Sequence, residues 1–331
     1  MSLFDPSARP YSRGSLRERI RSLVTALALL STIFVLAIFA LASAPPGGSP
    51  QEKGKKPPAL RWDPPQVDAP VPSLSDTPPC VLPDVLKLAA QRTAELIDHL
   101  QNFDAHEQIR YEETDGLGIP NLALGAKFDY IVDFGEQSGA LKVHETRTPL
   151  AGSDDANLHN IVDKGLPVLA LIFYPELQRD YEMRCEGVGQ WNNQPAWVVY
   201  FKQASGMRPR TLSMGTAATV YPVSLKGRAW IAVDSGQIMH LETNLEKGIP
   251  IIELRSNAVS IDYAPVAFPS RNIELWLPKS AIAYTDYGKR RTIIEHTFSD
   301  FQLFSVQTQQ VIEKPKDAPK DAPKDEPKQK P

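Results

Sequence analysis

Histidine is the side chain best suited to metal binding and proton transfer, but the histidines of this chain lack the spacing of a site. They stand at His99, His106, His144, His159, His240 and His296. No pair forms the H-x-x-x-H or H-E-x-x-H pattern, which places two imidazoles on one helix face. The sequence also has no G-x-S-x-G turn and no glycine-rich phosphate loop. We therefore expect no metal centre, no cofactor and no catalytic nucleophile.

Three acidic pairs could act as general acids and bases: Glu112–Glu113, Asp129 with Asp133, and Asp154–Asp155. Catalysis by any pair would require strongly perturbed pKa values. Solvated turns and strand ends account for the same residues without catalysis. A hydrolase is therefore the least favoured function, and we expect a protein that is not an enzyme.

The two cysteines, Cys80 and Cys185, could form a disulfide. Both fall in the part of the chain that we expect outside the cytoplasm, where disulfides persist. A bridge would close a loop of about 105 residues and stabilise the fold by roughly 3–5 kcal/mol in the chain-entropy model. Two free thiols are the alternative, because sequence spacing does not report proximity. We favour the bridge.

Six aromatic residues on expected strands are candidates for lining a ligand cavity: Phe128, Tyr130, Phe134, Trp197, Phe201 and Trp230. Such a cavity would suit a lipid. The same residues could instead form an ordinary core, since aromatic side chains dominate the cores of β proteins. An open apolar cavity larger than about 300 Å³, the lower range for ligand pockets, would separate the two uses.

The strongest signal for cellular placement is the run Leu23–Ala44, which has 22 residues and no charge. As a helix it is about 33 Å long, enough to cross the hydrocarbon core of a membrane. Five arginines precede it, at positions 9, 13, 17, 19 and 21. Basic residues beside a span stay in the cytoplasm, so we expect residues 1–22 inside and everything after residue 44 outside.

A cleaved signal peptide is the rival interpretation of this run. Ala42-Ser43-Ala44 has the small-x-small pattern of a cleavage site. However, the run is longer than the apolar core of roughly 7–15 residues in a signal peptide, and Pro45 would follow the cut directly. We therefore favour a retained single-pass anchor. The chain has no Asn-x-Ser/Thr acceptor for glycosylation, which favours the inner membrane of a bacterium.

Proline and charge patterns divide the rest of the chain. Residues 45–79 are rich in proline, which removes hydrogen-bond donors, and we expect a disordered linker that reaches at most about 108 Å. Residues 311–331 repeat Lys-Asp-Ala-Pro and should also be disordered. The folded body is expected over 80–310. It is acidic, with 28 acidic against 21 basic residues, so nucleic acid is an unfavourable partner.

The body begins with a helical pattern and continues with strands. From residue 82 to 103 apolar residues follow a 3.6-residue period. Alternation with a period of two follows, with turns at Asn192-Asn193, Asp234-Ser235-Gly236 and Tyr287-Gly288. A second helical stretch is expected from residue 158 to Pro175. These patterns predict an α+β fold, mainly antiparallel β, with about ten strands.

Two of the expected strands, at 196–201 and 229–233, are apolar on both faces. A sheet with one wet face would alternate instead, so both faces of these strands must be covered. We expect a curved sheet or open half-barrel wrapped around a few helices.

The order of elements resembles the LolA/LolB family of outer-membrane lipoprotein carriers and its RseB-like relatives. Residues 103–107, Phe-Asp-Ala-His-Glu, resemble the family's F-x-A-x-F strand. Residues 189–201 and 230–238 are similar to its later aromatic strand and D-x-x-G-x-I hairpin. The resemblance implies an open half-barrel closed by helices, with an apolar interior for acyl chains.

Two departures limit what the resemblance carries over. The family's carriers are soluble or lipid-anchored, whereas this chain has an expected membrane span. The Arg-Pro turn of the soluble carrier has no counterpart between Asp133 and Ser138, so its transfer mechanism is not implied. The resulting hypothesis is an anchored envelope protein whose exported body binds a lipid or an acylated, apolar ligand. The alternative is a protein interaction or stress-sensing module.

Overall fold

The computed structural model describes residues 58–71, 74–99, 102–137, 140–151, 165–167, 169–215 and 219–304. The expected membrane span at 23–44 and the tail at 311–331 lie outside these residues. Within the described ranges, no helix has both the length and the apolar character that a membrane crossing requires.

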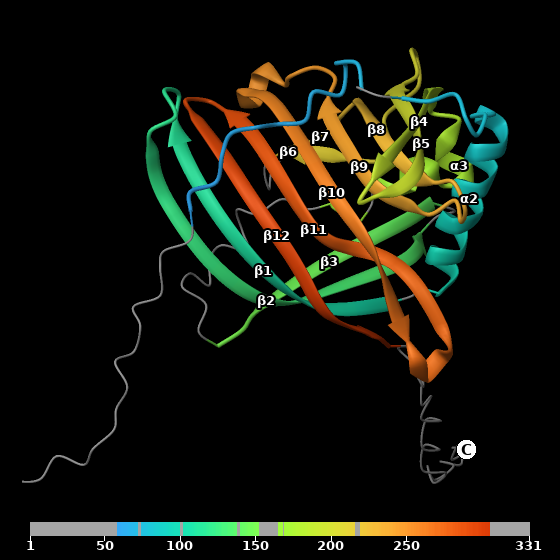
Figure 1. The fold of residues 1–331 in the computed structure, drawn as a ribbon. Coiled ribbons are helices and arrows are strands. Elements are labelled where there is room, and N and C mark those ends of the chain that lie inside the picture. Colours follow the sequence, from blue (N-terminus) through green and yellow to red (C-terminus); the bar gives the residue numbers. More distant parts are fainter. Residues whose placement is uncertain are drawn as a thin grey trace, which may run out of the picture. The chain divides into compact units, whose positions relative to one another are not determined.

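The body is built on one open antiparallel sheet of ten strands in the order β3-β2-β1-β12-β11-β10-β9-β8-β5-β4 (Figure 1). The strands are β1 (Asn102–Asp115), β2 (Pro120–Gln137), β3 (Ala140–Pro149), β4 (Tyr181–Trp191), β5 (Gln194–Gln203), β8 (Leu225–Ala232), β9 (Ile238–Leu245), β10 (Leu254–Phe268), β11 (Ile273–Tyr287) and β12 (Arg290–Leu303). A separate hairpin joins β6 (Ser213–Gly215) to β7 (Val220–Pro222). The expectation of a mainly antiparallel, open sheet of about ten strands is confirmed.

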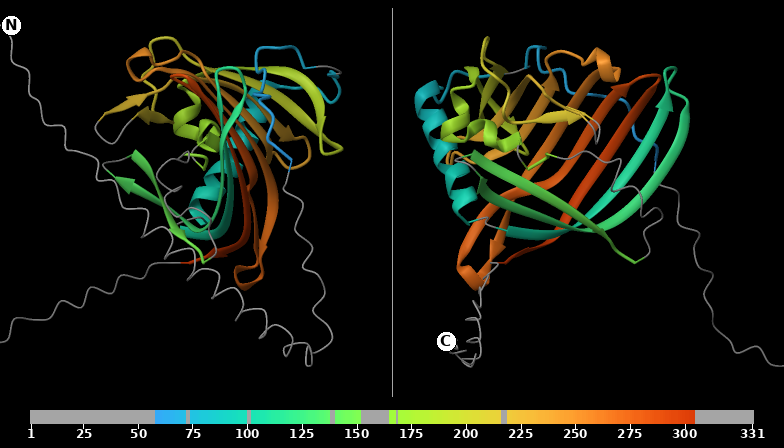
Figure 2. Two further views of the ribbon diagram at one scale, coloured as in Figure 1. Left: turned by 90° about the vertical axis from the view of Figure 1, so that its left-hand side faces the viewer. Right: turned by 180° about the vertical axis from the view of Figure 1, so that it is seen from behind.

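The helices lie against the concave face of this curved sheet (Figure 2). They are α2 (Leu82–His99), the 3-10 helix η2 (Leu169–Phe173) and α3 (Pro175–Gln178). The expected stripe of α2 is buried at Val85, Ala89 and Thr93, and the first two belong to the main core. Two further 3-10 turns, η3 (Pro250–Ile252) and η4 (Pro269–Arg271), sit in the β9–β10 and β10–β11 connections.

Strand alternation sends one set of side chains to the concave core and the other to the convex face. On β8, Ala229 and Ile231 join the main core beneath the helices, while Trp230 joins a second cluster on the opposite face. Gly227 is required on this strand because the ring of Phe201 and the carbonyl of Glu242 fill the space of a side chain. Both faces of the doubly apolar strands are therefore covered.

The cover on the convex face comes from the proline-rich residues 58–71 and 74–79, which contact the sheet, whereas the sequence pattern predicts a disordered linker there. The segment, here named the strap, runs across the strands with Val67 completely buried. Its free carbonyls accept hydrogen bonds from side chains of the sheet: Arg110 donates to Pro58 O at 2.7 Å, and Asn244 to Pro65 O at 3.1 Å. Proline prevents ladder pairing, but it leaves carbonyls that these side chains can bind.

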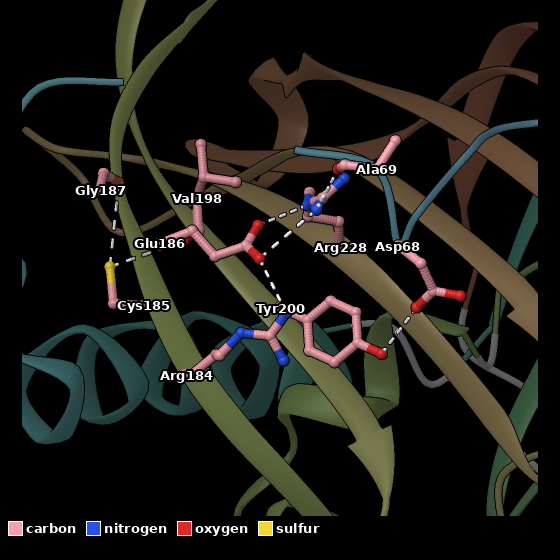
Figure 3. A network of polar contacts seen from close by, with 9 residues as sticks. All are labelled: Asp68, Ala69, Arg184, Cys185, Glu186, Gly187, Val198, Tyr200 and Arg228. Carbon is pink, nitrogen blue, oxygen red and sulfur yellow. Dashed lines mark hydrogen bonds and ion pairs between the residues drawn. The ribbon is translucent and has the colours of Figure 1, made fainter. Parts of the chain in front are cut away.

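Arg228 holds the middle of the strap (Figure 3). Its buried guanidinium donates to Ala69 O at 2.8 Å and to the Glu186 carboxylate at 2.5 Å. Beside it, the Tyr200 hydroxyl donates to Asp68 at 3.0 Å, and Lys226 pairs with the same carboxylate. These contacts join the strap to β4, β5 and β8.

A disulfide between Cys80 and Cys185 closes the strap onto β4 just before α2 begins. These are the two cysteines that the sequence offers for a bridge. Nearby, Ser75 exchanges two backbone hydrogen bonds with Val188, at 2.8 and 2.7 Å, along the outer edge of β4. The strap thus protects an edge strand that could otherwise pair with another chain.

Candidate functional site

The six aromatic candidates do not form one site, because they lie on both faces of the sheet. Phe128, Tyr130, Phe134 and Phe201 belong to the concave core, and Trp197 packs against it. Trp230 lies in the convex cluster, with its ring centroid 5.3 Å from that of Trp191. A single ligand cavity cannot be lined by all six residues.

The concave aromatic residues fill their space. The gap bounded by Phe103, Tyr130, Phe298 and Phe301 has no room for a water molecule. A second gap, beside Leu212 and neighbouring residues, holds about 10 Å³. The neighbouring rings touch: the centroids of Phe103 and Tyr130 are 6.4 Å apart in an edge-on arrangement. In these regions the aromatic residues form core rather than cavity.

A half-open pocket of about 200 Å³ lies elsewhere, between α2 and the ends of β9, β10 and β11. We call it the α2 pocket. Its lining residues are Arg92, Thr93, Glu95, Leu96 and His99 of α2, Ala170 of η2, Gln237, Ile238, Tyr263, and Ile273 to Trp276. Ala170, Ile238, Tyr263 and Leu275 are buried and make an apolar floor. None of the six aromatic candidates lines this pocket.

Tyr263 is the unusual group of the α2 pocket. Its side chain is buried, and its hydroxyl has no hydrogen-bond partner among the described residues. Burial raises the pKa of Tyr263 well above its ordinary value of 10.0, so the phenol stays neutral and keeps its proton. A buried hydroxyl without a partner costs about 1–3 kcal/mol. The Tyr263 hydroxyl therefore carries an unused hydrogen-bond donor within the lining of the α2 pocket.

The charges at the mouth of the pocket do not favour an anion. Arg92 is already engaged: its Nε donates to Ser235 O at 2.8 Å and its Nη1 to Glu95 at 2.7 Å. Glu274 adds a further negative charge at the mouth. An acceptor that is neutral, such as an ester or amide carbonyl, suits this environment better than a free carboxylate.

A buried ion network lies on the concave side of β1, β3 and β12. Arg147 donates to both oxygens of Glu107, at 2.6 and 3.0 Å, and Nδ1 of His296 lies 2.8 Å from the same carboxylate. Glu145 accepts from the Tyr130 hydroxyl at 2.7 Å and from the Gly165 amide at 2.6 Å. Burial opposes ionisation of Glu107, but His296 and Arg147 outweigh it and lower its pKa.

This network is satisfied mainly within itself, which fits a structural role. The exposed fractions of the Glu107 and Arg147 side chains are 0% and 3%, so a ligand could reach neither from the described surface. Only Nε2 of His296 lacks a partner among the described residues.

A second buried histidine lies on the convex face. The ring of His240 stacks on Trp191 with centroids 3.6 Å apart, and its Nδ1 lies 2.9 Å from Asp262. Its Nε2 is 3.5 Å from Glu242, beyond an ordinary hydrogen bond. Burial lowers the pKa of His240, but the two carboxylates outweigh that effect and raise it.

Across the described residues, no three His, Cys, Asp or Glu side chains cluster in a way that could hold a metal ion. The two members of the Glu112–Glu113 pair accept hydrogen bonds from different groups. Glu112 accepts a hydrogen bond from the Leu60 amide of the strap, and Glu113 accepts one from Tyr111. Asp154 and Asp155 lie outside the described residues.

No protein-family model matches the chain, and no curated protein sequence matches it significantly. Three solved structures are similar in fold. A DUF1329 family protein from Desulfovibrio piger covers 67% of this chain and 92% of its own, with 9% identity and a TM-score of 0.37. A putative outer membrane lipoprotein-sorting protein domain from Vibrio parahaemolyticus covers 68% and 92%, with 11% identity and a TM-score of 0.34.

The third is the MucA/MucB complex of Pseudomonas aeruginosa, which covers 66% of this chain and 99% of the matched one, with 10% identity and a TM-score of 0.20. The likeness is confined to the fold and says nothing about a ligand or partner of this chain.

Sequence reasoning missed the α2 pocket because its walls come from five separate parts of the chain. Tyr263 sits in an ordinary alternating strand, where nothing local shows that its hydroxyl lacks a partner. The one available signal is the polar stripe of α2, which ends in Arg92, Glu95 and His99 and which the helical pattern assigns to solvent.

Proposed function

We propose that the body is a non-enzymatic binding module of a bacterial cell envelope that takes the end of an acyl chain in the α2 pocket. The observation that carries this proposal is the buried hydroxyl of Tyr263, which has no partner among the described residues although Tyr263 is one of the residues that line a half-open pocket. The run Leu23–Ala44 would hold the protein in the inner membrane, with the body outside the cytoplasm.

The chemistry of the pocket selects for a chain with a carbonyl group. Ile238, Leu275 and Ala170 offer an apolar surface to methylene groups, each of which gains about 0.8 kcal/mol on burial. The neutral Tyr263 hydroxyl would donate to the ester or amide oxygen beside that chain. This contact would remove the cost of the unpaired hydroxyl, so binding gains from both parts of the ligand.

The size of the pocket limits the ligand. Its volume of about 200 Å³ is below the lower range of roughly 300 Å³ for drug-sized ligands. It suits one chain end and not a complete two-chain lipid. A singly acylated peptide or the exposed tip of one lipid chain therefore fits the proposal.

Binding is tested first by extraction of full-length protein, purified in detergent, with mass spectrometry of the extract. A fluorescent fatty-acid probe is then displaced with lauric acid methyl ester and, separately, with lauric acid. We expect the ester to displace the probe at lower concentration, because the mouth of the pocket carries uncompensated negative charge. If neither compound displaces the probe and no acyl chain is extracted, the proposal fails.

A pair of tyrosine variants separates binding from folding. Tyr263→Phe should weaken ester binding about five- to tenfold, the loss of one hydrogen bond, while stability stays equal or rises. Tyr181→Phe is the matched control. The Tyr181 hydroxyl lies 2.7 Å from the Thr211 hydroxyl, and neither residue lines the α2 pocket. That variant should lose about 1 kcal/mol of stability and bind the ester normally.

The packed concave core supports one alternative, a protein interaction module. The aromatic residues expected to line a cavity fill their space, so the concave side offers little room for lipid there. Crosslinking of the full-length protein in its own membrane would favour this alternative if it captured one protein partner while extraction found no acyl chain.

A further inference from the structure

Large apolar side chains lie exposed along one edge of the sheet. This edge, here named the hairpin rim, consists of the turns at 115–120, 246–253 and 287–290, which join β1 to β2, β9 to β10, and β11 to β12. It exposes Leu117, Ile119, Ile251 and Tyr287, with exposed fractions of 87%, 57%, 76% and 47%.

The three turns stand side by side along the upper edge in Figure 1. Asp115 pairs with Arg290 across β1 and β12, which places the first turn beside the third. The Gly288 amide donates to Glu253 O at 3.0 Å, which joins the third turn to the second. The three turns that carry these exposed apolar residues are therefore neighbours.

The first turn is built to hold its apolar side chains outward. The Asp115 carboxylate accepts hydrogen bonds from the amides of Leu117 and Ile119, both at 2.9 Å. Gly118 supplies the left-handed conformation that the turn needs, with φ of 82°. Exposed turns normally carry polar residues, so an ordered turn that displays leucine and isoleucine indicates a contact surface.

The three turns of the rim carry three basic residues, Lys247, Lys289 and Arg290, against three acidic ones, Asp115, Glu246 and Glu253, and several charges beside them are paired. Arg290 lies 3.4 Å from Glu113, and Asp286 pairs with both Arg255 and Arg291. Paired charges lower the cost of approaching an apolar phase. They also leave little net field, so contact would depend on apolar insertion and not on attraction to anionic lipids.

The chain enters the body close to this edge. The Leu60 amide donates to Glu112 at 2.8 Å, and Glu112 is three residues, about 10 Å of strand, from Asp115. Thirteen residues separate Ala44 from Pro58, and fully extended they reach only about 45 Å. A membrane span at Leu23–Ala44 would keep the rim near the membrane surface.

We propose that the hairpin rim docks into the interface of the membrane that holds the anchor and so fixes the orientation of the body. Leu117, Ile119 and Ile251 insert among the lipid headgroups, and Tyr287 lies at their level with its hydroxyl in water. Neighbouring turns with exposed apolar residues fit a fluid planar surface. This proposal is independent of the α2 pocket, which lies at the opposite ends of β9 and β11, about 45 Å of strand away.

The test places an environment-sensitive fluorophore on single introduced cysteines of the full-length protein in phosphatidylcholine vesicles. Leu117→Cys reports the rim, and Ser270→Cys in η4 reports the opposite edge. The native cysteines are paired with each other and do not label. We expect a blue-shifted emission and quenching by doxyl-labelled lipids at position 117, with neither at position 270.

Flotation of the vesicles tests the anchor separately from the rim. Protein that floats while both labels stay in a watery environment would overturn docking and keep the anchor. Docking is also overturned if the label at 117 is shielded only by a second copy or another protein, shown by crosslinking at that position. Protein that does not float, with a watery label at 117, would overturn the proposal as well.

A variant tests the chemistry of insertion. Leu117→Ser combined with Ile251→Ser should shift the docked-to-undocked ratio, reported by a label at Tyr287→Cys, about tenfold or more. Both changes lie on exposed side chains, so the unfolding curve should not move. The ratio should change little between about 0.1 and 1 M salt, whereas docking by surface charge would be screened. A docked-to-undocked ratio that changes with salt concentration but not with the two serine substitutions would refute apolar insertion.

Discussion

Removing one partner of the Glu107–Arg147 pair should destabilise the body severely. Glu107 is buried, and Arg147 donates two charge-assisted hydrogen bonds to it. Each such bond contributes about 1.5–3 kcal/mol, and loss of one partner from a buried pair costs about 3–5 kcal/mol. Glu107→Gln keeps one acceptor and should cost about 3 kcal/mol, whereas Glu107→Leu should approach 5 kcal/mol. The remaining carboxylate, Glu145, is 3.8 Å from the guanidinium and cannot replace the loss.

The assay is urea unfolding of the full-length protein in detergent, followed by tryptophan fluorescence with the disulfide intact. Glu95→Gln is the matched control, because it breaks an Arg–Glu pair whose side chains are 38% and 53% exposed. Exposed pairs contribute about 0–1 kcal/mol. A loss for Glu107→Gln no larger than that of Glu95→Gln would show that the network is hydrated and would refute the reasoning.

The pH dependence gives an independent check of the same network. The pKa of Glu107 lies below its ordinary value of 4.5 in the folded protein. Its contribution is therefore fully present above the unfolded pKa and is lost as the pH falls through the folded pKa. The native protein should lose stability below about pH 4.5, and Glu107→Gln should flatten that part of the curve.

Three further predictions concern the convex side. Reduction of the Cys80–Cys185 disulfide should lower the free energy of unfolding by about 3–5 kcal/mol, as measured by urea unfolding with and without reductant. The raised pKa of His240 implies stability that is present below its ordinary value of 6.5 and lost as the pH rises through the folded value; His240→Gln should abolish this loss. Asp68→Asn removes the partner of Lys226 and should speed proteolysis of the strap while the sheet remains folded.

Local patterns were enough to predict most of the sheet. Phe128, Tyr130 and Phe134 alternate with polar residues, and the structure turns all three to the concave core. The turn at Asn192-Asn193 needs two left-handed residues, which asparagine tolerates, and both have positive φ. Such features depend on neighbouring residues, so the sequence alone determines them.

Features that depend on distant contacts were not predictable. Glu107 lies on the same face of β1 as the buried Phe103 and Ala105, yet its partner Arg147 is 40 residues away in the sequence. A carboxylate on an apolar face is the one sequence signal of such a pair. The strap was missed for the same reason, because proline content predicts the absence of a ladder and does not reveal that Arg228 supplies a donor to its carbonyls.

The ordered strap changes how an anchored protein could work. A linker of 35 residues would let the body move up to about 108 Å from the membrane. The 13 residues between Ala44 and Pro58 allow only about 45 Å. With the hairpin rim against the membrane, the α2 pocket would open on the far end of the sheet. The ligand would then arrive from the side away from the anchoring membrane. A body held in this way would act as a fixed receiver of acyl groups brought to it, and not as a shuttle that extracts lipid from its own membrane.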